Sequence, residues 1–451
     1  MPEESNPSER SSVRRAAGAG GYDDAIRAMS CIHLPKLALL AGAAVSSGAM
    51  CLTWPSSFFS STHAGIRSIA EFDPPGGGTA APTPRAESNP VADWPVARGD
   101  QRLSGFASGS LPDRLTLRWT YDAGKSIASS PVAGGGRVYV GCDDMKLHCI
   151  DLATGAPVWT FETGEMIEAP PLVHDGTVYV GSGDFFFYAL DAATGSLRWK
   201  HETDDKVVGG ANWVKVNDET TLIIVGSFDN KLYAFDAATG EVKWTYLTEE
   251  RINAVPAVAG DRIIFGGCDR YVHEVRATDG AFIRKVFVGD EANMAGAVAV
   301  DGSQVYVGHM ANEFVRVDLD AERVAWRYQQ SRFPFYAAPA LAADRVVFAG
   351  RDKLVHCVKR ESGDVIWTFS TRRKIDGSPV IVGDKVIFGS GDGRLYMVSL
   401  ADGRELWSYE IGQPVYSSPA VAGGMVIVGA NDGRVYAFGA PNAPESGRKA
   451  P

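Results

Sequence analysis

The chain repeats itself at intervals of roughly 40 residues from Trp119 onward. Each unit has an apolar run ending in glycine, a short turn, an alternating run, a D-x-x-T-G-like turn and a strand with tryptophan, as in GSFDNKLYAFDAATGEVKW (226–244). The apolar residues alternate with period two, which indicates strands and excludes a helical solenoid. The anchor glycines are Gly141, Gly181, Gly226, Gly266, Gly308, Gly389 and Gly429, with Ala349 in the sixth slot.

Eight such units predict an all-β fold, an eight-bladed β-propeller of four-stranded antiparallel blades. A proline ten residues before the anchor slot marks the innermost strand, because proline suits a sheet edge. The tryptophans recur at one slot and are expected to pack in the seams between blades as a structural repeat. They are Trp119, Trp159, Trp199, Trp244, Trp326, Trp367 and Trp407, with Arg284 replacing the tryptophan in the fourth unit.

The two ends of the repeat region complement each other. The eighth unit stops at Val435–Ala440 without a tryptophan strand, and an orphan strand, LTLRWTYDAG, precedes the first unit. We therefore expect the N-terminal strand to complete the last blade and to remove two exposed sheet edges. The propeller domain is predicted to span residues 93–440.

Charge and cysteine content limit the class of function. The net charge is −10, which argues against a nucleic-acid partner, since such proteins need clustered Lys and Arg. None of the six cysteines forms a CxxC pair or has zinc-ligand spacing, so no metal site is expected. Cys149 and Cys357 stand where other units have alanine and are interpreted as small buried residues. Each follows a histidine, His148 and His356, for which no ligand partner nearby in sequence was expected. A Cys142–Cys149 disulfide is conceivable but not favoured.

The N-terminal region has a different composition. Residues 1–33 are predicted to be a disordered segment, 34–54 a signal peptide or signal-anchor helix, 55–92 a Pro/Gly/Ala-rich linker, and 441–451 a disordered tail. Leu37–Trp54 carries no charge and has Arg and Lys upstream, which favours an inside N-terminus. The segment is either an uncleaved anchor or a cleaved signal peptide of a chain that starts at Met29. Either alternative predicts an exported, periplasmic or extracytoplasmic propeller, with membrane contact through the N-terminal segment.

The repeated G-x-x-D…D-x-x-T-G-x-x-x-W set resembles the pyrroloquinoline-quinone (PQQ) repeat family of eight-bladed propellers. Gly226, Asp229, Asp236, Thr239 and Trp244 carry this resemblance in one unit. The family includes quinoprotein dehydrogenases and non-catalytic propellers similar to the outer-membrane assembly factor BamB. The resemblance implies the fold, and it leaves the function open between these two classes.

The resemblance to the dehydrogenases can be compared with the sequence. Those enzymes bind PQQ with Ca²⁺ and often carry an adjacent Cys-Cys disulfide, and no Cys-Cys pair occurs here. The aspartate that recurs in seven of the eight units is interpreted as turn chemistry. We therefore expect no catalytic residue and no cofactor, and favour a scaffold that binds a protein partner at the cell envelope. The alternative is a PQQ- and Ca²⁺-dependent quinoprotein oxidoreductase with divergent ligands.

Residues that break the repeat are the candidate site residues. Three positions before the inner-strand proline, the side chain changes from unit to unit, which suggests a wet channel lining. The channel-lining hypothesis names Glu168, Asn253, Tyr336, Asp376 and Tyr416, with Gly209 and Met294 aligned to the same slot in units that lack the proline.

A second set of candidates lies in the turns. In GSGDFFFYAL (181–190), Phe187 aligns with core leucines, whereas Phe185 and Phe186 occupy a hairpin tip where other units have mainly polar, flexible or small residues. Two loops on the same predicted face, QQSRFPFY and TRRKID, carry aromatic and basic residues. The partner-binding hypothesis names Phe185, Phe186, Phe333 and Phe335 as apolar anchors, with Arg332, Arg372 and Arg373 as polar support. The alternative is that each phenylalanine packs against an adjacent loop.

Overall fold

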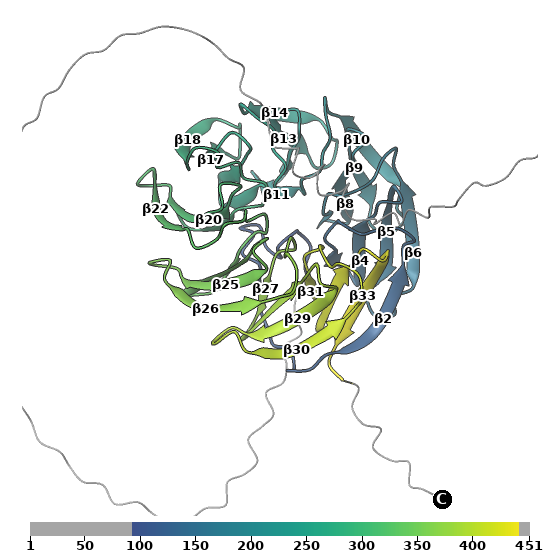
Figure 1. Cartoon of the computed structure of the whole chain (residues 1–451). Helices are drawn as coiled ribbons and strands as arrows, with labels where there is room; N and C mark the ends of the chain where they lie inside the picture. The colour runs from purple at the N-terminus through teal and green to yellow at the C-terminus, as the bar shows by residue number, and fades with distance from the viewer. Residues whose placement is uncertain (1–92, 442–451) are drawn as a thin grey trace, which may run out of the picture. The chain divides into compact units, whose positions relative to one another are not determined.

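The structure is a computed structural model that describes residues 93–441. The expectations for residues 1–92 and 442–451 lie outside the described residues. Between residues 93 and 441, every regular element is a strand, and the strands form eight sheets around a ring (Figure 1). No helix in this described range could cross a membrane. The predicted all-β, eight-bladed propeller is confirmed.

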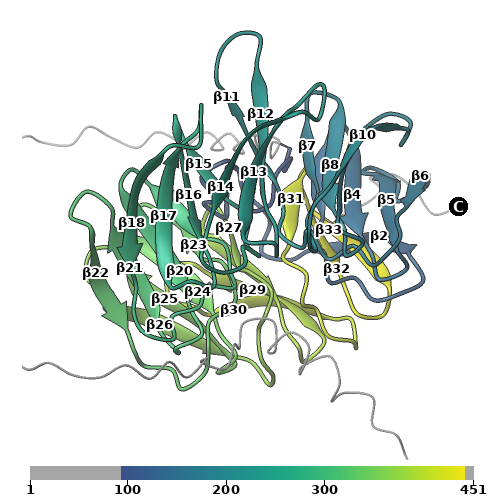
Figure 2. The same ribbon diagram turned by 90° about the horizontal axis from the view of Figure 1, so that it is seen from above.

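The first four blades follow one another in chain order, each with its innermost strand first. Their strands are β3 (Val132–Gly134), β4 (Arg137–Gly141), β5 (Lys146–Asp151) and β6 (Pro157–Glu162); β7 (Leu172–His174), β8 (Thr177–Gly181), β9 (Phe186–Asp191) and β10 (Leu197–Glu202); β11 (Asn212–Lys215), β12 (Thr221–Gly226), β13 (Lys231–Asp236) and β14 (Val242–Leu247); β15 (Ala257–Ala259), β16 (Arg262–Gly266), β17 (Tyr271–Arg276) and β18 (Phe282–Phe287). The five extra residues of the third unit lengthen the β11–β12 hairpin, which projects from the ring in Figure 2.

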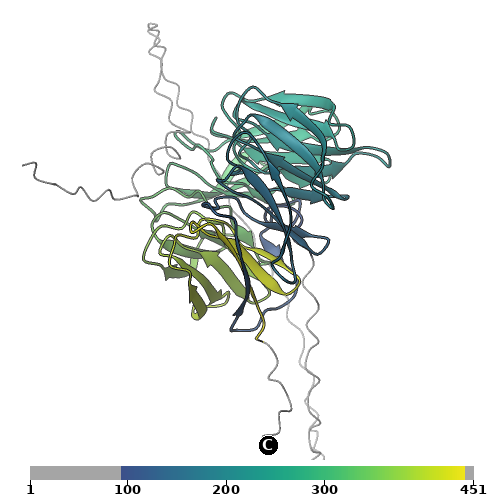
Figure 3. The same cartoon turned by 90° about the vertical axis from the view of Figure 1, so that its right-hand side faces the viewer.

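The second half of the ring continues the pattern. Its strands are β19 (Ala299–Asp301), β20 (Gln304–Gly308), β21 (Phe314–Asp318) and β22 (Arg323–Tyr328); β23 (Ala340–Leu341), β24 (Arg345–Ala349), β25 (Leu354–Lys359) and β26 (Val365–Ser370); β27 (Val380–Val382), β28 (Lys385–Gly389), β29 (Arg394–Ser399) and β30 (Glu405–Glu410); β31 (Ala420–Ala422), β32 (Met425–Gly429) and β33 (Arg434–Gly439). Seen side-on, the teal middle blades and the yellow C-terminal blades lie on opposite sides of the ring (Figure 3).

The ring is closed by strand β2 (Thr116–Asp122), which pairs antiparallel with β33 as the outermost strand of the eighth blade. The predicted closure by the N-terminal strand is therefore confirmed. One strand was not expected: β1 (Phe106–Ala107) pairs in parallel with β27, so the seventh sheet has five strands. The inner edge of that blade is covered and not open.

The recurring glycine and tryptophan have packing roles in the blade seams. A Cβ on Gly141 would lie 2.3 Å from Ile167 of the next blade, so only glycine allows that side chain to rest on the strand. The indole N–H of Trp119 donates to Leu152 O of the next blade at 2.9 Å. In the fourth blade Arg284 takes the place of the tryptophan, and its Nη1 donates to Leu319 O at 2.6 Å. The buried carboxylate of Glu274 lies 2.8 Å from Arg284 Nε and balances its charge. The same indole hydrogen bond to the next blade is made by five further tryptophans, Trp159, Trp199, Trp244, Trp326 and Trp367. Trp407 instead packs edge-on against Phe438 of the eighth blade.

A Tyr–His–Asp contact links neighbouring blades in three seams. In one of them, Tyr328 Oη lies 2.8 Å from His356 Nδ1, and His356 Nε2 lies 3.0 Å from Asp352. Tyr121–His148–Asp144 and Tyr246–His273–Asp269 repeat this arrangement. In a blade with tyrosine at the position of the histidine, as at Tyr188, the tyrosine hydroxyl donates directly to the turn aspartate, Asp184. The expectation that His148 has no nearby partner is wrong, because Asp144 lies four residues earlier.

The segment before β2 forms a strap inside the ring, defined here as residues 94–107. Its hydrogen bonds reach the inner strands in order: Trp94 with Ala133, Pro95 O with Val173 N, Gln101 O with Val258 N, Arg102 O with Val300 N, Ser104 O with Leu341 N and Gly105 O with Ile381 N. Gln101 also exchanges hydrogen bonds with the third blade through its side chain and Asn212. The strap thus contacts seven consecutive blades, and it brings residues from the start of the propeller into its centre.

Candidate functional site

Each blade has one candidate channel position, immediately after the side chain that packs on the preceding anchor residue. Val207 packs on Gly181 and Met294 packs on Gly266, so both are the packing residues of their blades. The channel position is therefore Val208 and Ala295 in those blades, and the sequence alignment of Gly209 and Met294 was one residue off. The full set is Ala128, Glu168, Val208, Asn253, Ala295, Tyr336, Asp376 and Tyr416.

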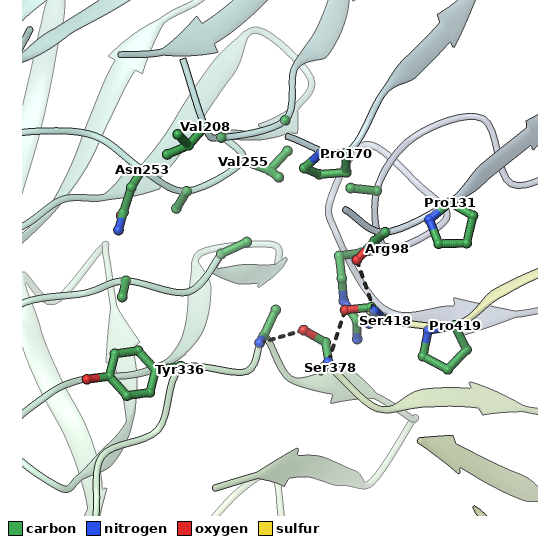
Figure 4. Close-up of a pocket in the computed structure, with 18 of the residues that line it drawn as sticks. Arg98, Pro131, Pro170, Val208, Asn253, Val255, Tyr336, Ser378, Ser418 and Pro419 are labelled. Carbon is green, nitrogen blue, oxygen red and sulfur yellow. Dashed lines mark hydrogen bonds between the residues drawn. The ribbon is translucent and has the colours of Figure 1, made fainter. Parts of the chain in front are cut away.

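A cavity of about 130 Å³ lies in the channel, and two of the five predicted lining residues contribute to it, Asn253 and Tyr336 (Figure 4). The rest of its wall consists mainly of proline, glycine, alanine, valine and serine. Glu168, Asp376 and Tyr416 are not among its lining residues. Of the five predicted lining residues, two therefore line the cavity and three lie elsewhere.

Asp376 belongs to a charged cluster between the sixth and seventh blades. Its carboxylate is 2.8 Å from Arg351 Nε and 3.3 Å from Lys374 Nζ. Arg351 stacks on the Tyr336 ring at 4.2 Å, and Lys374 lies 5.1 Å from the ring centre of Tyr416. Three of the predicted residues are therefore brought together, with a carboxylate already neutralised by two cations. Glu168 comes from the second blade, half-buried and away from this cluster in sequence and blade order.

Sequence reasoning missed the residue at the floor of the cavity, Arg98. The strap carries Arg98 into the channel, and its Nη2 donates to Pro339 O (2.9 Å) and Pro379 O (2.6 Å) on the sixth and seventh blades. Its side chain is only 5% exposed, and burial lowers its pKa to about 9 although Asp100 opposes the shift. Nothing in the sequence distinguishes Arg98 from the other arginines before the first blade, since its position follows from the path of the strap.

The cavity can be compared with the calcium–quinone pair that the repeat family suggests. Calcium takes six to eight oxygen ligands, typically with carboxylates among them. No carboxylate lines this cavity in the described chain, and its charged lining residue is the cation Arg98. Its volume also falls below the roughly 300–1,000 Å³ of usual ligand pockets. The residues that line this cavity do not fit a calcium–quinone site.

Cys142, Asp144 and His148 lie close enough together to resemble a metal site. Burial raises the pKa of the Cys142 thiol to about 12. The thiol instead faces Lys125 O at 3.3 Å, in the slot where Ser182 and Ser227 contact carbonyls of the preceding connection. In the first blade, Cys142 therefore makes the contact with the preceding connection that a serine makes in the second and third blades. Cys142, Cys149, Cys268 and Cys357 are buried and form no disulfide with one another.

The hairpin-tip phenylalanines differ from one another. Phe187 is fully buried, as predicted, and Phe185 is 40% exposed at a backbone φ of 73°. Phe186 is half-buried against Tyr188, and Lys200 Nζ sits 4.0 Å from its ring centre. Of the two exceptional phenylalanines, one projects to solvent and the other packs on its own blade.

The remaining partner-binding candidates fall in two groups. Phe335 is 1% exposed and packs on Gly308 and against Phe348, so its assignment as a surface anchor is wrong. Phe333 is 52% exposed, and Arg332, Arg372 and Arg373 are also exposed. These residues belong to the connections around the sixth blade, whereas Phe185 belongs to the second. The structure therefore places the candidates in two sectors of the ring and not in one patch.

Two exposed methionines extend the sector around Phe185. Met145 has the same turn position in the first blade, and Met166 lies in the connection between the two blades. Thr163 N donates to Met145 O, and Gly183 N donates to Met166 O, which ties this connection to both hairpins. Met145, Met166 and Phe185, called here the apolar face, are thus three exposed apolar side chains on the turns and the connection of two adjacent blades.

The fold and channel define an eight-bladed propeller of PQQ-type repeats with a strap through its centre. The family described as "Outer membrane protein assembly factor BamB" matches residues 113–210, 188–283, 272–413 and 351–444. The chain belongs to this family. No curated protein matches the sequence.

Solved structures share the fold at low sequence identity. BamB from Moraxella catarrhalis has a TM-score of 0.61 at 17% identity, covering 72% of this chain and 100% of that one. Quinohemoprotein alcohol dehydrogenase from Comamonas testosteroni has a TM-score of 0.66 at 16% identity, covering 80% and 83%. The computationally designed Ika8 protein has a TM-score of 0.61 at 15% identity, covering 70% and 98%. An assembly factor, an enzyme and a designed protein share this architecture, so the fold alone does not assign a function.

Proposed function

We propose that this protein is a non-catalytic interaction propeller of the cell envelope, exported or anchored by its N-terminal segment, and that the apolar face binds a protein partner. The observation that carries the proposal is the exposure of Phe185 at a turn position where the seventh and eighth blades have Gly393 and Gly433. The exposed part of an apolar side chain contributes little to folding, and aromatic residues including phenylalanine are enriched in protein interfaces.

The neighbourhood of Phe185 supports the same proposal. Met145 and Met166 add flexible apolar side chains, which adapt well to a partner surface. Lys200 beside Phe186 adds a cation at the edge of the face. Arg332, Phe333, Arg372 and Arg373 form a second exposed sector, which could contact the same partner only if that partner spans the ring.

The test is a crosslinked pull-down from the native envelope fraction with three proteins. Phe185→Asn uses the residue that the third blade carries at this turn, Asn230, and so keeps the backbone conformation. Phe282→Thr is the matched control. Phe282 is 58% exposed and lies at the end of an outer strand that is remote from the hairpin turns. We expect the wild type and Phe282→Thr to capture the same partner in equal amounts, and Phe185→Asn to capture at least tenfold less of it. Equal capture by all three would contradict the proposal.

The quinoprotein oxidoreductase alternative has a separate test. The cavity offers no carboxylate for Ca²⁺ among its described lining residues. Titration with PQQ and Ca²⁺, followed by dye reduction with alcohols, would reveal such an activity, and we expect neither binding nor reduction.

A further inference from the structure

Arg98 is a buried cation that forms no ion pair in the described chain. Its Nη2 is satisfied by two carbonyl groups, whereas Nε and Nη1 have no hydrogen-bond partner among the described residues. In the described chain, no carboxylate forms an ion pair with it; the nearby Asp100 is engaged by Ser104 through its backbone N–H (2.9 Å) and its hydroxyl (2.5 Å). Proteins rarely bury a charge in this way, because removing it from water is costly unless an opposite charge compensates.

The cavity beside Arg98 has one charged lining residue, Arg98 itself, and most of its other lining residues are apolar. Pro131, Pro170, Val255 and Pro419 contribute apolar surface. Figure 4 shows Arg98 near Ser378 and Ser418, and Asn253 extending from the opposite wall. The side-chain oxygen of Asn253 has no partner in the described chain.

The backbone around the cavity is asymmetric in its hydrogen bonding. On one side, serine hydroxyls accept from amides of the preceding blade: Ala338 N to Ser378, Ser378 N to Ser418, and Ser418 N to Ser130. On the other side, the equivalent positions are Pro170, Gly210, Val255 and Ala297, which have no hydroxyl. The amides of Gly210 and Val255 therefore have no serine of this kind to donate to.

We infer that the channel is a binding site for a small organic carboxylate, with the carboxylate toward Arg98 and its carbon chain against the proline- and valine-lined wall. The charge favours an anion, and the apolar wall favours an organic anion over phosphate or chloride. The cavity of about 130 Å³ is similar to an engineered cavity of about 150 Å³ that holds benzene, so a ligand of roughly six non-hydrogen atoms fits. This inference does not depend on the apolar face.

Ligand-observed ¹³C NMR with labelled acetate and propionate tests the inference, in parallel with thermal unfolding at constant ionic strength. Wild type should broaden both signals and gain thermal stability with carboxylate but not with equal chloride or phosphate. Arg98→Met keeps the length of the side chain without its charge and should reduce the broadening at least tenfold. Arg102→Gln is the matched control, because Arg102 is in the same strap but half-exposed, and it should behave as wild type.

A second variant covers the case in which Arg98→Met does not fold. Ala295→Tyr places in the fifth blade the residue that the sixth and eighth blades carry at the same position, Tyr336 and Tyr416. It should fold normally, fill the cavity and abolish the carboxylate response. The inference is overturned if wild type shows no carboxylate-specific response, if chloride or phosphate compete equally well, or if either Arg98→Met or Ala295→Tyr responds as wild type does.

Discussion

At the scale of single residues, the most informative positions are those where one blade departs from the others. Phe185 is the one aromatic residue at a turn position that has a positive φ in every blade and is otherwise occupied by Met145, Asn230, Arg270, Asn312, Lys353, Gly393 and Gly433. A left-handed backbone conformation costs a non-glycine residue roughly 1–2 kcal/mol. His309 stands where three blades carry serine, at Ser182, Ser227 and Ser390, and is almost fully buried. Both departures carry a cost, which makes each of them testable.

Replacing Phe185 by glycine should not destabilise the propeller. The substitution removes the positive-φ strain and loses only a partly exposed side chain, so the free energy of unfolding should stay level or rise by up to about 1 kcal/mol. Urea denaturation of Phe185→Gly and of Phe187→Ala measures this. The second variant empties a buried site and should lose about 3–5 kcal/mol. A clear loss of stability in Phe185→Gly would show that Phe185 packs on the fold.

His309 should make the propeller sensitive to acid. Burial lowers the pKa of His309 to about 4, and Glu313, whose carboxylate is 3.5 Å away, opposes this shift only in part. Since the folded pKa lies below the ordinary value of 6.5, the unfolded state binds the proton more readily, and stability falls as the pH drops from 6.5 towards 4. Between pH 6.5 and pH 4, this proton uptake should lower the free energy of unfolding of the wild type by on the order of 2–3 kcal/mol, and His309→Ser should not show this decrease. Parallel pH dependences of wild type and variant in urea denaturation would contradict this.

At the scale of the elements, the seams between blades depend on matched pairs. Tyr328 and His356 are both buried and bonded to each other, whereas other seams pair phenylalanine with tyrosine, as in Phe161 with Tyr188 and Phe369 with Tyr396. Tyr328→Phe alone should cost about 1–3 kcal/mol, because it leaves His356 Nδ1 without a partner. The double variant Tyr328→Phe/His356→Tyr recreates the other seam type and should recover most of that loss. A double-mutant cycle on unfolding free energies tests this, and additive effects would contradict it.

The elements also show what the sequence could and could not predict. The anchor glycines, the tryptophan slot and closure by β2 follow from local repeats, because the same contact recurs in each blade. Phe335 was misassigned because its loop resembles an exposed connection, although it occupies the packing slot that Ile167 fills in the second blade. The strap and Arg98 were not predictable, since their contacts with seven blades come from a single segment that has no repeat to compare with.

At the scale of the whole molecule, β2 and the strap close the ring in two different ways. β2 supplies the outermost strand of the eighth blade, and the strap crosses the inner strands and braces the centre through Arg98. Removing β2 leaves an unpaired edge on β33, and an exposed edge favours aggregation. Removing the strap alone exposes inner-strand amides but leaves the ring complete.

Three chains separate these contributions: residues 93–441, 112–441 and 124–441. The first should unfold cooperatively and with the same midpoint as the propeller of the full chain. The second keeps β2 and loses the strap, so its midpoint should fall by several degrees or more while unfolding remains cooperative. The third loses β2 as well and should aggregate or lose cooperative unfolding. Calorimetry with light scattering measures all three, and equal midpoints for the first two chains would show that the strap rests on the ring without stabilising it.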